Sequence, residues 1–299
     1  MSQAPPDEQG LAALQTAQES QRISPHLKVV FHGVDFSGGR RHREKIFMSS
    51  LVEGLPAETR GGLCHAEILE HVAGSATDGR RHFWLIDATF GLPAELLALH
   101  GVETRWRASA EWLASFPSPR DWRRACRKKS RRELRRLTDR NAKTPFAPTN
   151  LRMFRQTWHC MVSLLLPLSD RPNVAILPFA AAPCPEADQR ASSAWSRAPV
   201  WVGEGCPSST LRQAARPHRG YKGVSEKNRG LRRHLLDLLV REDGITVTAD
   251  SAALAADDED GDALDSLLLL PAARRFALSD PAAVLASEPM AAVEGYVYR

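Results

Sequence analysis

Short apolar runs and amphipathic segments follow one another along this chain. Residues 28–36 and 83–88 are apolar segments of strand length, and Ser-Gly-Gly at 37–39 is a turn signal after the first. A strand-like segment at 45–51 is expected to pair with the first strand as an antiparallel hairpin. Apolar positions in 61–73 recur at the spacing of a helix. This order predicts an α/β protein with a mixed sheet flanked by helices.

The middle of the chain, around 100–170, is expected to be a helical insertion into that architecture. Ser118-Pro119 begins a predicted basic helix over 120–143, because serine caps a helix start and proline suits its first position. Pro271 should kink the last helix, since proline removes a backbone donor. The other predicted elements are a helix over 151–166, strands at 173–179 and 199–203, a helix over 225–242, a strand at 244–248 and a last helix that contains Asp262 and Asp265.

Composition agrees with a globular protein. With 299 residues, 43% hydrophobic and 25% charged, the chain is long enough to bury a sizeable core. Residues 1–26 lack the apolar stretch of a secretory signal and are expected to be a disordered tail before a single domain over 27–299. Five scattered cysteines with no Cys-x-x-Cys pair favour a reducing cytoplasm over a disulfide framework or zinc site. No apolar run approaches the ~18–20 residues that span a bilayer, so no membrane association is expected.

Carboxylates at the ends of apolar runs are the main candidates for chemistry. Asp35, Asp87 and Glu204 each end such a run. Asp262 and Asp265 lie three apart on the last helix, which places them on one face with Cβ atoms roughly 5–6 Å apart. Carboxylates are rarely buried unless they are paired or bind a metal. Their positions therefore favour a shared cation.

Most of these carboxylates also have an ordinary alternative. Asp35 can cap the Ser-Gly-Gly turn, and Asp87 can cap a helix start. Asp262 and Asp265 can belong to a solvated helix start, where acidic residues favour the positive end of the helix dipole. Glu204 has no comparably obvious turn role. Taken singly, the residues leave both interpretations open.

The predicted helix over 120–143 is the second candidate site. The net charge of +5 permits binding to a polyanion, and much of the positive charge is concentrated here beside a stripe of apolar positions. Such a helix can be a solvated surface helix, or it can contact phosphates without regard to sequence. The proposed phosphate-binding residues on it are Arg124, Arg127, Lys128, Arg131 and Arg135.

A series of short motifs resembles a known family. The motifs are Gly-Val-Asp-Phe-Ser-Gly (33–38), Ile-Asp-Ala-Thr-Phe-Gly-Leu-Pro (86–93), Thr-Asp (138–139), Glu-Gly-Cys-Pro (204–207), Tyr-Lys-Gly (221–223) and Asp-Ala-Leu-Asp (262–265). In this order they resemble the motifs of domain of unknown function family 429, which is described as a family of predicted RNase H-like nucleases. The similarity extends from about residue 28 to Glu-Gly-Tyr-Val at 294–297.

The resemblance implies an RNase H-like fold and a metal-dependent nuclease. Asp35 would be the central metal ligand, and Asp87 or Glu204 together with Asp262 or Asp265 would complete the catalytic site. Two Mg²⁺ or Mn²⁺ ions ~3.5–4 Å apart would activate a water for attack on a phosphodiester. Lys222 would contact the scissile phosphate.

Two other functions stay open at this point. A non-catalytic protein on the same scaffold would bind nucleic acid, either DNA or RNA, through the basic helix over 120–143. The sugar kinase and actin superfamily shares the sheet topology and a phosphate-binding turn of the Asp-x-Gly type. Its members generally need two copies of the fold, and only one can be placed in this sequence.

Overall fold

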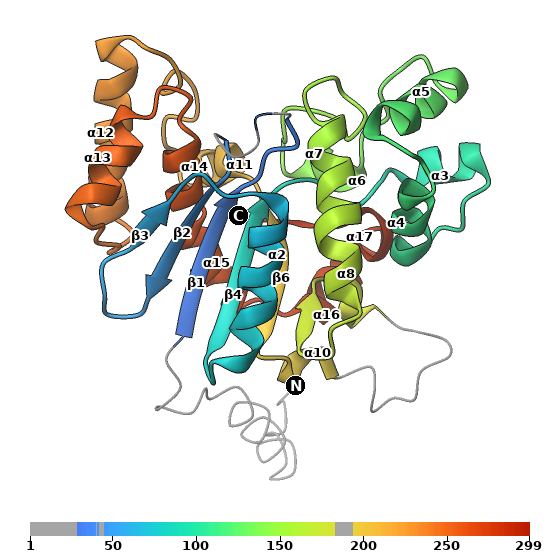
Figure 1. Cartoon of the computed structure of the whole chain (residues 1–299), viewed down its shortest axis with the longest axis horizontal. Helices are drawn as coiled ribbons and strands as arrows, with labels where there is room; N and C mark the ends of the chain where they lie inside the picture. Colours follow the sequence, from blue (N-terminus) through green and yellow to red (C-terminus); the bar gives the residue numbers. More distant parts are fainter. Residues whose placement is uncertain (1–28, 40, 42–44, 183–193) are drawn as a thin grey trace, which may run out of the picture.

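A mixed sheet flanked by helices forms the centre of the molecule, as the apolar pattern predicts (Figure 1). The structure, a computed structural model, describes residues 29–39, 41, 45–182 and 194–299. The tail expected over 1–26 lies outside the described residues. No helix in the described part of the chain is long and apolar enough to cross a membrane.

The sheet has the strand order β3-β2-β1-β4-β6-β5, and β7 pairs with the end of β6. β1 pairs antiparallel with β2 and parallel with β4, and β6 pairs parallel with β4 and β5. The hairpin expected at the start of the chain is therefore confirmed. The strands are β1 (Val29–Asp35), β2 (Phe47–Val52), β3 (Glu58–Arg60), β4 (Arg81–Asp87), β5 (Val174–Ile176), β6 (Val200–Gly205) and β7 (Val297–Tyr298).

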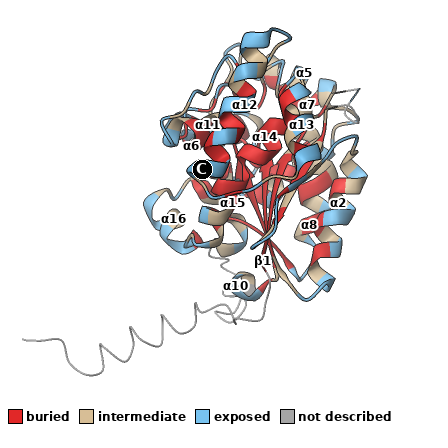
Figure 2. Ribbon diagram, turned by 90° about the vertical axis from the view of Figure 1, so that its left-hand side faces the viewer, coloured by how far each residue is buried: buried red, intermediate tan, exposed pale blue. Residues whose placement is uncertain are grey.

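Alternate residues of the central strands enter two separate cores, one on each face of the sheet. Figure 2 shows the buried strands of the sheet with helices packed beside them. Phe31 and Phe83 pack on the first face with α11 (Pro207–Gln213), α12 (Glu226–Arg241), α13 (Ala249–Asp257), α14 (Asp262–Leu268) and α15 (Leu270–Ala277). Val34 and Trp84 pack on the second face with α2 (His65–Gly74), α3 (Ala94–His100), α4 (Trp106–Ala114), α5 (Pro119–Lys129), α7 (Phe154–His159), η3 (Cys160–Leu165) and α8 (Leu166–Ser169). The smaller helices are η2 (Ser75–Thr77), α6 (Leu137–Asn141), η4 (Phe179–Ala181), α10 (Ala194–Arg197), α16 (Pro281–Ser287) and α17 (Ala291–Glu294).

Three local predictions can be compared directly with the structure. The helix expected over 120–143 is not continuous, because α5 ends at Lys129 and the chain is not helical again until α6. In between, Leu134 is buried, as expected of the apolar stripe, but Arg136 is buried as well, which the cationic face of the predicted helix did not anticipate. The segment 244–248 forms a single bridge, Ala57 to Val247, instead of a strand. The kink expected at Pro271 takes the form of a break, since α14 ends at Leu268 and α15 carries Pro271 in its first turn.

Candidate metal centre

Two aspartates end neighbouring parallel strands at the same level of the sheet. Asp35 of β1 and Asp87 of β4 are register partners. Their side chains point to the face that α14 covers, because they alternate with Val34 and Ile86, which belong to the opposite core. The carboxyl ends of two parallel strands thus bring both carboxylates to one edge of the sheet.

The helix α14 carries two more carboxylates to the same place. Asp35, Asp262 and Asp265 each offer an oxygen atom, and these atoms lie within 4.8 Å of one another. Gly33 makes this approach possible, because a Cβ atom there would lie 2.1 Å from the Ser266 carbonyl oxygen. The absence of a side chain at residue 33 lets α14 rest directly on β1. The convergence expected of Asp35, Asp262 and Asp265 is therefore present.

Burial and mutual repulsion disfavour the ionised form of the clustered carboxylates. Burial and then the charges of Asp262 and Asp265 raise the pKa of Asp35 well above its usual range. Burial and then the charge of Asp265 raise the pKa of Asp87 to about 8. Burial also raises the pKa of Asp262. In the described residues no hydrogen bond or ion pair is made by the side chains of Asp35 and Asp87, so both carboxylates are available to a ligand.

Lys222 supplies positive charge to the helix side of the cluster. Its ammonium group lies 2.6 Å from Asp265 and 3.2 Å from Asp262. Burial alone would lower the pKa of Lys222, but the charges of Asp265, Asp35 and Asp262 outweigh it and raise that pKa. The resemblance assigns Lys222 to the scissile phosphate, whereas the structure places it on the carboxylates. Lys45 adds a second ammonium group, 3.8 Å from Asp262.

A buried arginine fixes the loop that carries Lys222. The Arg232 guanidinium donates to the carbonyl oxygens of Tyr221 at 2.7 Å and Gly223 at 3.0 Å. Tyr221 in turn donates its hydroxyl to Asp265 at 2.7 Å, which holds that carboxylate in place. Arg232 therefore positions Tyr221 and Lys222, which contact the acidic cluster, without contacting the cluster itself. Arg232 is one of four arginines in α12, and nothing in the sequence distinguishes it from the other three.

Glu204 differs from the expectation that it shares a cation with Asp35. It is the register partner of Ile86, so its side chain points to the face opposite Asp35 and Asp87. There Arg136 donates to both of its carboxylate oxygens, at 2.5 and 2.7 Å, and the Phe90 amide donates to one of them at 3.0 Å. Its oxygens are thus engaged by protein donors rather than by the acidic cluster.

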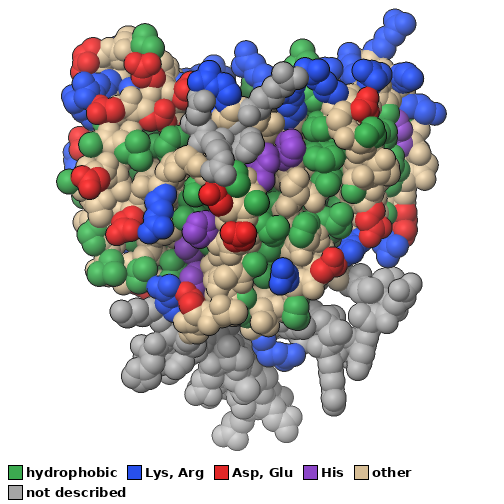
Figure 3. Space-filling model, viewed as in Figure 1, with side chains coloured by type: hydrophobic (Ala, Val, Ile, Leu, Met, Phe, Trp, Pro, Cys, Tyr) green, Lys and Arg blue, Asp and Glu red, His purple; other side chains and the backbone are tan. Residues whose placement is uncertain are grey.

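A pocket of ≈ 1150 Å³ opens over the acids, and arginines surround it. In Figure 3, Lys and Arg side chains gather along the upper edge of the molecule, where α5 and α7 lie in Figure 1. The lining arginines other than Arg136 are Arg120, Arg123, Arg124, Arg127, Arg152 and Arg155.

Three of the six predicted phosphate-binding residues line the pocket, and the other three do not. Arg124 and Arg127 line the pocket, as does Lys222. Lys128 and Arg131 are exposed but do not line it. Arg135 donates to the Thr144 carbonyl oxygen and so fixes the backbone.

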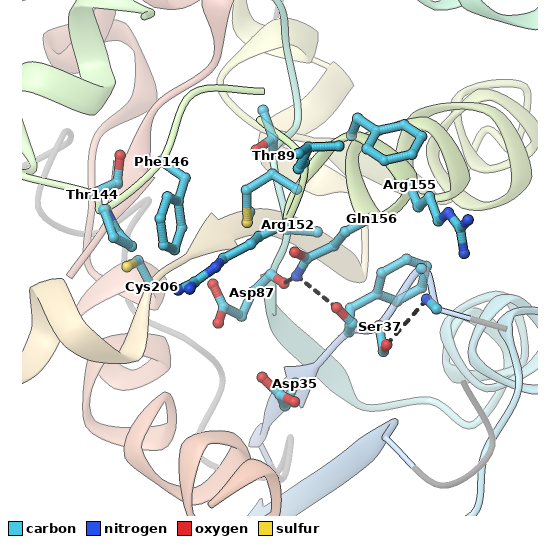
Figure 4. A pocket seen from close by; sticks show the side chains of 18 of the residues that line it. Asp35, Ser37, Asp87, Thr89, Thr144, Phe146, Arg152, Arg155, Gln156 and Cys206 are labelled. Atoms are coloured by element: carbon cyan, nitrogen blue, oxygen red, sulfur yellow. Dashed lines mark hydrogen bonds between the residues drawn. The ribbon is translucent and has the colours of Figure 1, made fainter. Parts of the chain in front are cut away.

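Gln156 ties the pocket wall to the strand ends. Its side-chain amide donates to the carbonyl oxygens of Phe36, at 2.6 Å, and of Asp87 (Figure 4). Gly38 allows this contact, because a Cβ atom there would lie 2.2 Å from the Gln156 backbone nitrogen. The sequence gives no signal for either Gln156 on α7 or Arg152 in the turn before it, because neither residue belongs to a motif.

Known proteins give no indication of what the acidic cluster does. No family model, no curated protein and no solved structure matches the chain. The resemblance to domain of unknown function family 429 therefore stays a prediction. The cluster itself fits a divalent ion, because three carboxylates converge with oxygen atoms only, the ligands that Mg²⁺ and Mn²⁺ prefer.

Proposed function

We propose that the protein is a divalent-metal-dependent nuclease that hydrolyses phosphodiester bonds in nucleic acid. The observation that carries this proposal is the convergence of Asp35, Asp262 and Asp265 at the floor of an arginine-lined pocket. The mixed sheet agrees with the RNase H-like fold that the resemblance implies. A buried carboxylate cluster and a surrounding ring of arginines are what a cation and a polyanion require together.

The residues have separate tasks in this proposal. Asp35, Asp262 and Asp265 would hold Mg²⁺ or Mn²⁺, which supplies Lewis-acid activation of a water and neutralises charge on the phosphate. Asp87, the register partner of Asp35, would lie beside the reacting atoms, where it would ligate the ion or accept a proton. Arg124 and Arg127 would position the phosphate backbone.

Cleavage assays test the proposal. The wild-type protein should cut DNA or RNA oligonucleotides with Mg²⁺ or Mn²⁺ and lose the activity in EDTA. Asp35→Asn should lower the rate at least ~100-fold, because losing an activated water or its ligand costs several kcal/mol. Asp237→Asn is the matched control, since Asp237 is an exposed carboxylate on α12 outside the pocket. Equal cleavage by Asp35→Asn and wild type would overturn the proposal.

A second candidate is a non-catalytic nucleic-acid-binding protein. The ion pairs of Lys222 with Asp262 and Asp265 favour it, because they partly neutralise the cluster without a metal. This alternative predicts salt-sensitive binding that Asp35→Asn leaves unchanged and Arg127→Gln weakens. Arg140→Gln on α6, an exposed arginine outside the pocket, is its control.

A cytoplasmic location completes the proposal. Cys64, Cys126, Cys160 and Cys206 are free thiols, and all but Cys64 are buried. Free thiols are stable in a reducing compartment.

A further inference from the structure

Phe146 is an aromatic residue that the cores do not use. It lines the pocket and is half-buried, whereas its neighbours Thr144 and Ala147 are buried. Among the described residues, neither of the two large apolar clusters includes Phe146 or packs against it. Its ring is therefore presented to the pocket rather than buried for stability (Figure 4).

The loop that carries Phe146 is fixed on both sides. Before it, the Thr144 hydroxyl donates to Asp139 at 2.9 Å. After it, Arg123 donates to the Thr149 carbonyl at 2.9 Å, and the Thr157 hydroxyl donates to the Pro148 carbonyl at 3.2 Å. Pro145 and Pro148 restrict the backbone on either side of the ring. The ring is thus held ready for a ligand, which lowers the entropy cost of binding.

Arg152 extends across the pocket to the same ring. Its guanidinium carbon lies 5.2 Å from the centre of the Phe146 ring, a cation–π distance. In the described part of the chain the Arg152 guanidinium makes no ion pair, so it can contact a phosphate. A planar apolar ring, the guanidinium that contacts it and nearby carboxylates occur in one cavity.

We propose that Phe146 stacks on an unpaired nucleobase of the substrate and that Arg152 binds an adjoining phosphate, which makes single-stranded nucleic acid the substrate class. This inference rests on the proposed function, because it places the strand beside the acidic cluster. A pocket of ≈ 1150 Å³ has room for a nucleotide. A paired base stays stacked inside its duplex and cannot reach the ring unless it is flipped out. Aromatic stacking accepts every base, so little sequence preference is expected.

Binding to a fluorescent base tests the proposal without requiring cleavage. Asp35→Asn protein would be titrated with single-stranded oligonucleotides that contain 2-aminopurine, whose emission is quenched when it stacks. Phe146→Leu should abolish the quenching and weaken single-strand binding about 5- to 100-fold. Phe146→Tyr should retain both. Phe116→Leu is the matched control, because Phe116 is a half-buried aromatic outside the pocket. Melting temperatures establish that every variant is folded.

The outcomes separate this inference from the nuclease proposal. If wild-type protein cleaves a single strand and Phe146→Leu shows the same KM and quenching, the stacking subsite is overturned while the nuclease stands. If no metal-dependent cleavage is seen but quenching depends on Phe146, the subsite is supported and the nuclease fails. Equal binding of duplex and single strand, unaffected by Phe146→Leu, would overturn the substrate class.

Discussion

Arg136 and Glu204 form a two-point ion pair in the interior, with nitrogen–oxygen distances of 2.5 and 2.7 Å. Arg136 is 1% exposed and Glu204 is 3% exposed. The same guanidinium also binds the Asp139 carboxylate at 2.7 Å. One arginine thus neutralises two buried acids and joins α6 to β6 in the wall of the pocket.

Removal of Arg136 should destabilise the fold strongly. Arg136→Met leaves Glu204 and Asp139 buried without a counter-charge and should lower the free energy of unfolding by ~3–5 kcal/mol. Glu204→Gln should cost less, ~1–3 kcal/mol, because Arg136 keeps Asp139. Urea denaturation of the three proteins measures both values. A loss in Arg136→Met no larger than that in Glu204→Gln would contradict this account of the network.

Stability of the metal-free protein should fall as pH rises. The folded state raises the pKa of Asp87 from 3.8 to about 8, mainly through burial and then through Asp265. Between these values the folded protein holds a proton that the unfolded chain has released, so the free energy of unfolding decreases with pH. Mn²⁺ or Mg²⁺ should oppose the decrease, since a divalent ion binds the ionised carboxylates.

Urea midpoints from about pH 5 to about pH 8, with and without the ion, measure this dependence. Asp87→Asn should flatten the metal-free curve, whereas Asp237→Asn on the exposed face of α12 should leave its slope unchanged. An unaltered slope in Asp87→Asn would show that Asp87 does not hold the proton.

The sequence predicts that acidic residues meet at the sheet edge, but it does not show that Glu204 lies outside this cluster. Asp35 and Asp87 end apolar strands, and Asp262 and Asp265 share a helix face, all of which can be inferred from spacing. Glu204 also ends an apolar strand, but its direction depends on the β4–β6 register. Register between distant strands is a tertiary property, so no local pattern separates Glu204 from the aspartates.

The basic segment over 120–143 also depends on tertiary contacts that its sequence does not reveal. A density of arginines predicts a cationic helix, yet the chain leaves helical geometry after Lys129, where Leu134 and Arg136 turn inward. Charge patterns cannot reveal that one arginine in such a run is buried by Glu204, 68 residues away. Arg152 reaches the pocket from a separate segment, and only the folded chain brings it beside Phe146.

Glycine at position 38 should be essential to the contact between the strand ends and α7. In Gly38→Ala the new Cβ atom would lie 2.2–2.5 Å from backbone atoms of Arg155 and Gln156, so the turn or the helix must shift. The variant should lose ~1–3 kcal/mol of stability, as overpacking does. Gly230→Ala is the matched control: residue 230 lies in α12 with nothing within 4 Å, so alanine should stabilise by up to ~1 kcal/mol. Thermal or urea unfolding measures both, and equal effects would contradict the close approach.

Lys222 should compete with a divalent ion for the cluster. Its ammonium group forms ion pairs with Asp262 and Asp265, which an incoming ion must weaken or displace. Because Lys222 is half-exposed, the competition should be modest, and Lys222→Ala should bind Mn²⁺ about 2- to 10-fold more tightly, worth ~0.4–1.4 kcal/mol. Titration calorimetry measures the Kd, with Lys227→Ala, an exposed lysine on α12, as the control. A Kd that is unchanged or weaker in Lys222→Ala would mean that the lysine supports the ion rather than competing with it.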